Sequence, residues 1–390
     1  MTVLTGLDEF KSEYYKILKG QRLGLLSNQA SVSKDLTHAR ETLYSLFPDN
    51  LKALYGPQHG YAGEDQDNMI ETGHSYDKEL KIPVFSLYSE SREPTSEMLD
   101  LIDVLVIDMQ DVGTRVYTFT STMLNCLKAA KKYSKRVVIL DRPNPLGGDV
   151  IEGNLLSPEL FSFVGPFSMP MRHGMTMGEL ALLFNREFSI GCDLEIIKMK
   201  GWDRTMLWED TALIWAVPSP NMPLPETAYV YPGQVIWEGT NISEGRGTCR
   251  PFEIFGAPFL DTHLIKRKVP PHFLKGCTLR EISFKPTFNK WHDQICKGFM
   301  IHILDRKIFR SYETAIALLR TIVEIHQDEF TWKDPPYEYV YDKLPIDLII
   351  GNTGLRKAIE KGEHINRIKD IWLLERKDFI ELREQYLLYK

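Results

Sequence analysis

The sequence lacks long apolar segments and any excess of basic residues, and each absence excludes a class of protein. No apolar run approaches the roughly 18 residues that a membrane-spanning helix requires. The 47 lysines and arginines are outnumbered by 53 aspartates and glutamates, which gives a net charge of −6. This balance argues against a nucleic-acid-binding protein that depends on a broad basic surface. We therefore expect no membrane span and no nucleic-acid partner.

Cysteine is also scarce. The five cysteines are odd in number and widely spaced, and none belongs to a CxxC pair: Cys126, Cys192, Cys249, Cys277 and Cys296. This usage indicates reduced thiols, not a disulfide scaffold or a zinc site. There is no HExxH, HxH or EF-hand pattern, and no GxGxxG follows the first expected strand. We therefore expect no metal and no cofactor.

The first ten residues, MTVLTGLDEF, contain neither a basic region nor an apolar region of the kind found in secretory signals. If Met1 is the natural start, we expect a cytoplasmic protein. If a leader was removed, the protein is periplasmic or secreted.

The sequence does contain alternating strand-like and helix-like segments. Of its 390 residues, 43% are hydrophobic and 26% charged, a mix typical of globular proteins, and the length favours two domains. Strands are expected at 22–28, 51–55, 83–88, 104–108, 137–140 and 194–198, and helices at 37–46, 95–101, 121–133 and 177–188. This order predicts βαβ units and a mostly parallel sheet. The fold class is α/β, with a Rossmann-like domain at 1–248.

A smaller α/β domain is expected at 249–390, with strands at 279–285 and 298–304 and helices at 312–327 and 370–386. Before it lies a stretch at 218–247 that is rich in Pro, Gly, Ser, Thr and Asn. We expect this stretch to be irregular, and long irregular segments in compact proteins are usually functional.

Polar loops follow several of the expected strands. In an open α/β sheet, ligands bind outside the carboxyl ends of the strands. The loop GPQHGYAGEDQDN (56–68) contains three glycines that let the backbone approach a ligand. His59 in this loop is a candidate acid, base or hydrogen-bond donor; the alternative is a histidine that orders its own loop.

Two further loops have the same character. Asp108, Gln110, Asp111 and Arg115 follow the most apolar strand, and Asp141, Arg142, Asn144 and Glu152 follow the next one. A structural ion pair or a turn cap is the alternative to a site in these loops. His173, next to Arg172, is either structural or part of an anion site.

The segments PSPNMP (218–223) and WEGTNISEGRGTCRPFE (237–253) complete the set. The first offers Ser219 and Asn221, and no GxSxG surrounds Ser219, which argues against a hydrolase nucleophile elbow. The second concentrates charged and amide side chains between glycines, among them Glu238, Asn241, Glu244, Arg246 and Arg250. Carboxylates, amides, arginines and aromatic rings together suit a sugar ligand, and two carboxyl groups suffice for glycoside hydrolysis.

These motifs together resemble one family. The segments GLLSNQA, GPQHGYAGEDQDN, SLYSESREPTSEML, DVLVIDMQDVGTRVYT, PMRHGMTMGELA, PSPNMP and EGTNISEGRGTCRPFEIFGAPF are similar to those of the bacterial exo-β-N-acetylmuramidases of the NamZ type. The resemblance implies a Rossmann-like N-terminal domain, a smaller C-terminal α/β domain and a site in the cleft between them. It also implies release of N-acetylmuramic acid from the non-reducing end of peptidoglycan fragments, without metal or nucleotide.

The chain departs from this family at one position. Family members carry Glu-His-Gly in the first glycine loop, where this chain has Gln58-His59-Gly60. Glutamine cannot protonate a leaving group, so the role of that Glu does not transfer to position 58. The acid then comes from Glu64, or from Glu152, Glu238 or Glu244, or the protein acts on a different sugar or only binds one. In a substrate-assisted mechanism, Gln58 would orient the acetamide.

The working hypothesis is a glycosidase acting on amino sugars of the cell wall. Glu64 and Glu152 are the first candidates for general acid or base, with Glu238, Glu244 and His59 as further catalytic candidates. Sugar hydroxyls and the acetamide are assigned to His59, Asp108, Gln110, Asn144 and Asn241. The lactyl carboxylate of muramic acid is assigned to Arg142, His173, Arg246 or Arg250, because a guanidinium binds a carboxylate as a fork. Gln58, Arg115 and Asn221 are further substrate-binding candidates.

Two other functions compete with this one. The first is a non-catalytic amino-sugar-binding protein, which Gln58 favours. The second is a dinucleotide-dependent enzyme, which the missing glycine fingerprint argues against. The sequence leaves the oligomeric state open.

Overall fold

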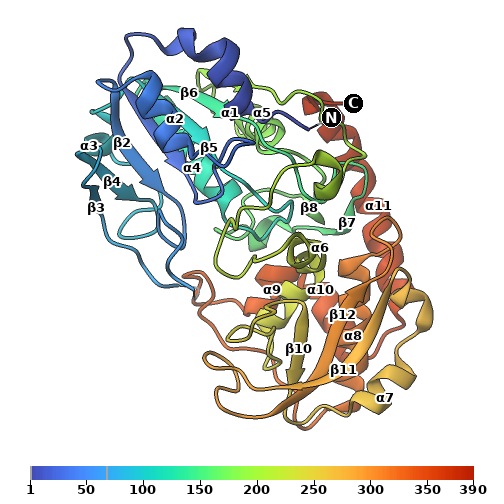
Figure 1. The fold of residues 1–390 in the computed structure, drawn as a ribbon. Helices are drawn as coiled ribbons and strands as arrows, with labels where there is room; N and C mark the ends of the chain where they lie inside the picture. Colours follow the sequence, from blue (N-terminus) through green and yellow to red (C-terminus); the bar gives the residue numbers. More distant parts are fainter. Residues whose placement is uncertain (1, 67–68) are drawn as a thin grey trace.

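A seven-stranded sheet forms the centre of the first lobe in this computed structural model, which describes residues 2–66 and 69–390 (Figure 1). The strand order is β3-β4-β2-β1-β5-β6-β9. The strands are β1 (Leu23–Ser27), β2 (Leu51–Gly56), β3 (Ser75–Asp77), β4 (Ile82–Ser86), β5 (Val104–Asp108), β6 (Arg136–Leu140) and β9 (Leu194–Ile197). All neighbours pair in parallel except the edge strand β3. The predicted mostly parallel sheet is confirmed.

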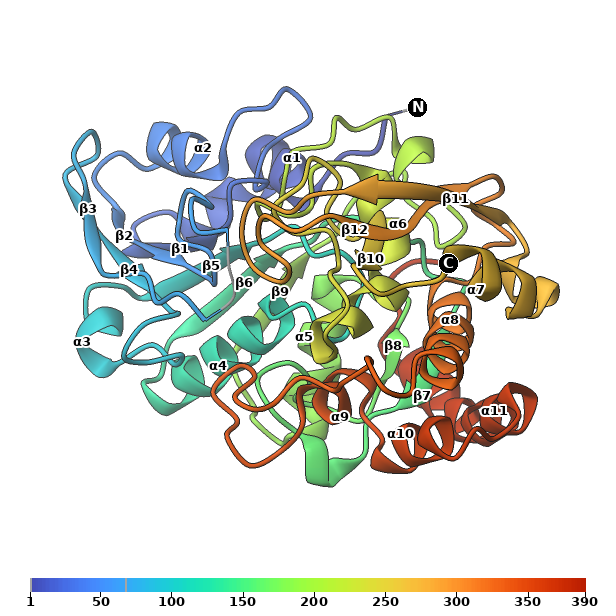
Figure 2. The same ribbon diagram turned by 90° about the horizontal axis from the view of Figure 1, so that it is seen from below.

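Helices cover both faces of this sheet, as Figure 2 shows. They are α1 (Gly6–Glu9), α2 (Ala39–Leu46), α3 (Ser96–Leu99), α4 (Phe119–Lys132) and α5 (Met177–Glu187). Alternate residues of β5 belong to different cores: Leu105 and Ile107 to one, and Val104 and Val106 to the other. Because both faces of β5 are buried, its sequence is apolar without interruption.

The predicted N-terminus of α5 is confirmed in detail. The hydroxyl of Thr176 accepts a hydrogen bond from the main-chain N–H of Glu179, and the Glu179 carboxylate accepts one from the N–H of Thr176. This capping box satisfies two amide groups that a helix start leaves without partners.

An antiparallel sheet of three strands forms the second lobe, in the order β10 (Ile254–Ala257), β12 (Cys296–Ile303) and β11 (Cys277–Phe284). The remaining elements of the chain are α6 (Pro225–Gln234), α7 (Thr262–Lys268), α8 (Ser311–Ile325), α9 (Pro345–Ile350), α10 (Thr353–Glu360), α11 (Ile365–Arg383) and the strand pair β7 (Glu152–Leu155) and β8 (Pro170–Arg172). A mixed sheet-and-helix C-terminal unit agrees with the predicted α/β character.

The stretch 218–247 is not irregular throughout, which corrects the sequence-based prediction. Helix α6 and a 3-10 helix (Val235–Gly239) lie within it. Pro225 occupies the first turn of α6, where proline costs no hydrogen bond. Every residue from Thr227 to Gln234 is buried, so tertiary packing outweighs the presence of Pro232 and Gly233. A Cβ on Gly233 would lie 2.1 Å from the carbonyl oxygen of Ser311 in α8, so glycine permits this close approach.

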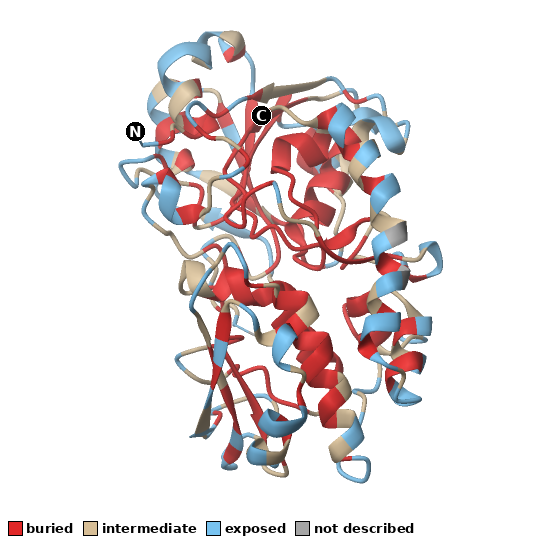
Figure 3. Ribbon diagram, turned by 90° about the vertical axis from the view of Figure 1, so that its right-hand side faces the viewer, coloured by how far each residue is buried: buried red, intermediate tan, exposed pale blue. Residues whose placement is uncertain are grey.

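The two lobes are joined by buried polar contacts and by the C-terminal segment. The Arg115 guanidinium donates to the carbonyl of Ile349 at 2.6 Å, and Asn154 Nδ2 donates to the carbonyl of Ile350 at 2.8 Å. At the end of the chain, the Tyr389 hydroxyl donates to Asp141 in the first lobe at 2.7 Å. Both termini lie on the first lobe (Figure 1), and buried residues continue across the junction of the lobes (Figure 3).

None of the helices within residues 2–66 and 69–390 combines the length and the apolar character needed to cross a membrane. All five cysteines are free thiols, as their spacing predicted.

Candidate active site

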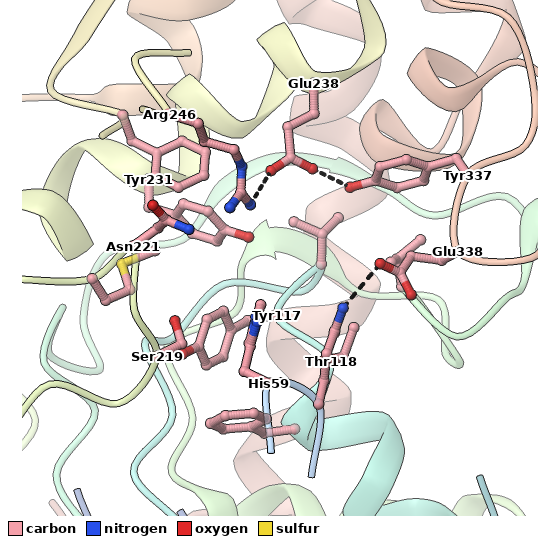
Figure 4. A pocket seen from close by; sticks show the side chains of 16 residues that line it. His59, Tyr117, Thr118, Ser219, Asn221, Tyr231, Glu238, Arg246, Tyr337 and Glu338 are labelled. Carbon is pink, nitrogen blue, oxygen red and sulfur yellow. Dashed lines mark hydrogen bonds and ion pairs between the residues drawn. The ribbon is translucent and has the colours of Figure 1, made fainter. Parts of the chain in front are cut away.

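Loops from both lobes meet around one pocket (Figure 4). The first lobe contributes the glycine loop after β2 and the segment that leads from β5 into α4. The segment after α6 and the loop before α9 supply the opposite side. The polar and aromatic lining residues are Gln58, His59, Tyr117, Thr118, Phe119, Ser219, Asn221, Tyr231, Glu238, Arg246, Phe252, Tyr337 and Glu338.

Glu238 is a buried carboxylate held by one cation and one hydroxyl. Its Oε1 lies 2.8 Å from Arg246 Nη2, and its Oε2 accepts a hydrogen bond from the Tyr337 hydroxyl at 2.6 Å. Burial by itself would raise the pKa of Glu238, but the Arg246 charge and these two donors outweigh it, and the net pKa is lowered. Glu238 is therefore ionised in the folded protein.

Glu338 is a second buried carboxyl, and its donors are neutral. Oε1 accepts from the Gln58 amide at 3.1 Å, and Oε2 accepts from the Tyr88 hydroxyl at 2.5 Å. Burial raises the pKa of Glu338; the two hydrogen bonds oppose this rise without cancelling it, and the nearby Glu238 charge adds to it. Two carboxyl groups whose pKa values are displaced in opposite directions are the arrangement that separates an acid from a base.

The amide of Gln58 is oriented by Thr118. The Thr118 hydroxyl donates to Gln58 Oε1 at 2.5 Å, which leaves Nε2 directed at Glu338. All three side chains are buried. Gln58 thus acts as a neutral donor to the carboxyl across the pocket.

His59 lies in a turn with a left-handed backbone. Its φ is +77° and that of Gly60 is +85°. Its Nδ1 lies 2.7 Å from the carbonyl oxygen of Asp65. Because a carbonyl only accepts, Nδ1 carries the proton, and in the neutral imidazole Nε2 is then the acceptor nitrogen. The histidine both orders its loop and lines the pocket, so the two interpretations of it from the sequence are compatible.

Aromatic rings form one wall of the pocket. Tyr117 and Tyr231 meet edge to face with centroids 5.9 Å apart, and Tyr231 meets Phe252 in the same way at 4.8 Å. The Arg246 guanidinium lies 5.2 Å from the Phe252 ring. Rings with hydroxyl groups beside carboxylates and amides suit a hydroxylated, partly apolar ligand such as a sugar.

Several pocket residues have left-handed backbone angles that non-glycine residues rarely adopt. Besides His59, these are Phe252 (φ +62°) and Glu338 (φ +44°). Each costs roughly 1–2 kcal/mol and persists only where the surroundings impose it.

Five of the residues predicted from the sequence line the pocket. They are Gln58, His59, Asn221, Glu238 and Arg246. Glu244 does not line the pocket itself. Its carboxylate contacts a residue that does, Arg246, at 3.4 Å from Nε, and it also pairs with Lys290 at 2.7 Å. Arg246 thus bridges two buried carboxylates, and its Nη1 also donates to the carbonyl of Gln66.

Other predicted residues lie outside the pocket in buried contacts at the carboxyl edge of the sheet. Arg142 pairs with Asp108 as a fork through its Nε and Nη2, with Nη2 and Oδ2 2.9 Å apart. Gln110 donates to the carbonyls of Asp111 and Pro143. Asn144 donates to the carbonyl of Met175 and accepts from the N–H of Leu146.

A further group is buried at the junction of the lobes. Glu152 pairs with Arg172 at 3.0 Å and accepts from the N–H of Tyr312. Arg115 donates to main-chain carbonyls, as described above. His173 is fully buried, and burial together with four nearby arginines lowers its pKa to about 3. His173 is therefore neutral.

The remaining three are peripheral. Glu64 is exposed in the glycine loop. Asn241 donates to the carbonyl of Glu329 at 2.8 Å, and Arg250 pairs with Glu253 at 3.1 Å; neither lines the pocket. Asp67 and Asn68 of the glycine motif lie outside the described residues.

Sequence reasoning missed most of the aromatic wall and one of the two pocket carboxyls. Tyr117 and Thr118 stand inside a motif that was recognised, and Tyr231 falls in the stretch expected to be irregular. Tyr337 and Glu338 belong to PPYEYVYD (335–342). An acid between tyrosines after a proline pair was the available signal.

No group of three or more His, Cys, Asp or Glu side chains that could hold a metal ion occurs in the part of the chain that the structure describes. The two carboxyl groups of the pocket instead accept hydrogen bonds from hydroxyls, an amide and an arginine.

Comparison with known proteins places this architecture in a family. Residues 23–226 match the model for the N-terminal part of the exo-β-N-acetylmuramidase NamZ, and residues 229–389 match the model for its C-terminal part. These models divide the chain between 226 and 229; the sequence-based boundary at 248/249 stays a prediction.

Individual relatives span nearly the whole chain. The peptidoglycan β-N-acetylmuramidase NamZ of Bacillus subtilis (strain 168) is 42% identical over 387 residues, which cover 99% of this chain and 91% of that protein. Two crystal structures of DUF1343 family proteins from Bacteroides fragilis superpose on the chain. Their TM-scores are 0.88 and 0.77, their identities 33% and 27%, and each comparison covers 100% of this chain and 99% of the other. The chain therefore belongs to the NamZ family of exo-β-N-acetylmuramidases.

Proposed function

We propose that this chain is a glycoside hydrolase that releases N-acetylmuramic acid from the non-reducing end of peptidoglycan fragments. The Bacillus subtilis relative is named a peptidoglycan β-N-acetylmuramidase. The observation that carries the proposal is the pair of buried carboxyl groups in one pocket, Glu238 with a lowered pKa and Glu338 with a raised one.

Glu338 is the general acid in this proposal. Its raised pKa favours the protonated form, and it gives its proton to the glycosidic oxygen as the bond to the anomeric carbon breaks. Water supplies the hydroxyl that the anomeric carbon takes up. The carboxylate that remains is stabilised by Tyr88 and Gln58, which already donate to it.

Glu238 is the ionised partner. Hydrolysis passes through a transition state with positive charge at the anomeric carbon, and a carboxylate in the same pocket stabilises that charge. Arg246 and Tyr337 hold Glu238 ionised and fix its orientation. Glu338 and Glu238 fill both carboxyl roles in this proposal, so it assigns no catalytic role to Glu64 or Glu152.

Gln58 becomes a positioning residue. The resemblance implies a glutamate there, and in this chain the Gln58 amide donates to Glu338 instead. We propose that the acid function resides on Glu338, with Gln58 and Thr118 holding its carboxyl in place. The sugar rests against Tyr117, Tyr231 and Phe252, with His59 and Asn221 facing its polar groups.

The test is turnover of 4-nitrophenyl β-N-acetylmuramide, with the N-acetylglucosaminide as a control. The proposal expects release of free N-acetylmuramic acid by the wild type and much slower release from the control. The Gln58→Glu variant is measured beside it, because a specific observation, the replaced glutamate, favours a second function. An inactive wild type with an active Gln58→Glu variant would mean that this protein binds the sugar without cleaving it.

A further inference from the structure

Arg92 lies beside the pocket and differs from the other arginines described above. It stands in the loop between β4 and α3, after the carboxyl end of a parallel strand. Its guanidinium carbon lies 3.9 Å from the centroid of the Tyr339 ring, 4.6 Å from that of Tyr88 and 5.6 Å from that of Phe163. Aromatic rings, not carboxylates, hold this cation in place.

This environment leaves hydrogen-bonding capacity unused. Among the described residues Arg92 forms no ion pair, and its Nη2 is buried without a hydrogen-bond partner of good geometry. By contrast, Arg142, Arg172 and Arg246 each contact a buried carboxylate. A guanidinium stacked on rings presents its edge, the part that binds a carboxylate as a fork.

Arg92 is also close to the proposed acid. Tyr88 connects them, since its ring contacts Arg92 while its hydroxyl donates to Glu338 at 2.5 Å. Tyr339, which stacks on Arg92, directly follows Glu338 in the chain. The positive charge of Arg92 acts on the Glu338 carboxyl, so the cation and the acid belong to one electrostatic unit.

We propose that Arg92 binds the lactyl carboxylate of N-acetylmuramic acid and thereby determines specificity for this sugar over N-acetylglucosamine. This inference rests on the proposed function. The two sugars differ only by the lactyl ether on O3, whose distinguishing group is an anion. An arginine without a protein carboxylate, next to the acid that protonates the glycosidic oxygen of the same sugar, is the group that recognises that anion.

The experiment compares two substrates that differ only in this charge: 4-nitrophenyl β-N-acetylmuramide and its lactyl methyl ester. In the wild type, kcat/KM is expected to be about 10- to 150-fold higher for the acid than for the ester, the effect of a charge-assisted hydrogen-bonded pair. In Arg92→Gln this ratio falls to near one because the acid loses its advantage. Arg92→Lys restores part of it, since it keeps the charge without the fork.

Arg22→Gln is the matched control, because Arg22 pairs with Asp103 in an exposed contact at the amino end of the sheet. It should leave the ratio unchanged, and circular dichroism of both variants checks folding. If Arg92→Gln acted only through Glu338, it would lower kcat/KM equally for both substrates and leave their ratio unchanged. That result would overturn the inference.

Calorimetric binding of free N-acetylmuramic acid and N-acetylglucosamine separates this inference from the proposed hydrolysis. If the wild type cleaves neither glycoside yet prefers muramic acid, and Arg92→Gln abolishes that preference, Arg92 keeps its assignment and the hydrolase proposal fails. If the wild type cleaves the muramide and Arg92→Gln keeps the preference, only the Arg92 inference fails. Absence of both cleavage and preference in the wild type would overturn both.

Discussion

The buried carboxylates of the sheet edge and those of the pocket look alike in the sequence and behave differently in the fold. At the sheet edge and beneath it, Asp108, Glu152 and Glu179 each contact an arginine of their own, at 2.9, 3.0 and 2.7 Å. In the pocket, Glu338 meets the neutral donors Tyr88 and Gln58. The first group is therefore neutralised by neighbouring guanidinium groups, whereas burial among neutral donors raises the pKa of Glu338.

The physical reason is the cost of burying charge. A carboxylate removed from water needs a cation and further hydrogen bonds, and an arginine fork supplies both. Neutral donors compensate only part of the desolvation, which leaves the pKa raised. The neutral donors therefore separate Glu338 from the carboxylates that contact an arginine, Glu238 of the pocket included.

Replacing Glu338 with Gln should produce the largest effect on catalysis. Loss of a general acid lowers kcat by about 10²–10⁴-fold, while an amide of equal size keeps hydrogen bonds to Tyr88 and Gln58. The loss of kcat should be larger for a muramic-acid-containing disaccharide than for the nitrophenyl glycoside, because nitrophenolate leaves with less need of protonation. Activity within tenfold of the wild type on the disaccharide would remove Glu338 from the role of acid.

Replacing Glu152 with Gln should lower the stability of the protein and leave its catalytic rate unchanged. It leaves Arg172 as a buried charge without its carboxylate, and breaking a buried pair in this way costs about 3–5 kcal/mol in the free energy of unfolding. Denaturant unfolding measures this cost, and kcat per folded molecule should stay near that of the wild type. The control is Glu381→Gln, which removes an exposed pair at 3.8 Å and should cost less than about 1 kcal/mol. Equal costs for the two variants would contradict the distinction.

The smallest expected effects concern the pH dependence of kcat/KM, which tests the opposite pKa shifts of Glu238 and Glu338. Glu238 must be ionised and Glu338 protonated, so the profile should be bell-shaped. The acid limb follows the lowered pKa of Glu238, and the alkaline limb follows the raised pKa of Glu338.

Two hydroxyl deletions move the limbs separately. Tyr88→Phe removes a donor that lowers the pKa of Glu338, so the alkaline limb should move to higher pH while the acid limb stays. Tyr337→Phe removes a donor that lowers the pKa of Glu238, so the acid limb should move to higher pH while the alkaline limb stays. If one deletion moved both limbs, the two limbs would belong to a different pair of groups.

Much of the fold could be predicted because local sequence patterns specify many of its strands and helices. The strand at Val104–Asp108 is apolar without interruption, and the Thr176–Glu179 capping box marks a helix start with two side chains. Helix α6 could not be predicted in this way, since Pro232 and Gly233 argue against a helix and only packing on α8 makes one favourable.

The candidate site was partly within reach of the sequence. The glycine loop, PSPNMP and the polar segment at 237–253 each contribute pocket residues, because loops at the carboxyl ends of strands gather polar groups. Which of the glutamates faces the pocket was out of reach. Glu64, Glu152, Glu238 and Glu244 all stand in polar, glycine-containing segments, and composition does not separate them.

What the sequence determined by itself is therefore the parallel sheet, the loops at its edge and the family. Short apolar runs, helical patterns, turn residues and long ordered motifs carry that information locally. Only the tertiary structure decided that Glu338 meets Gln58 from 280 positions away and that Arg92 is held by aromatic rings without a carboxylate. Protonation and free donors depend on burial and on distant neighbours, which no local pattern encodes.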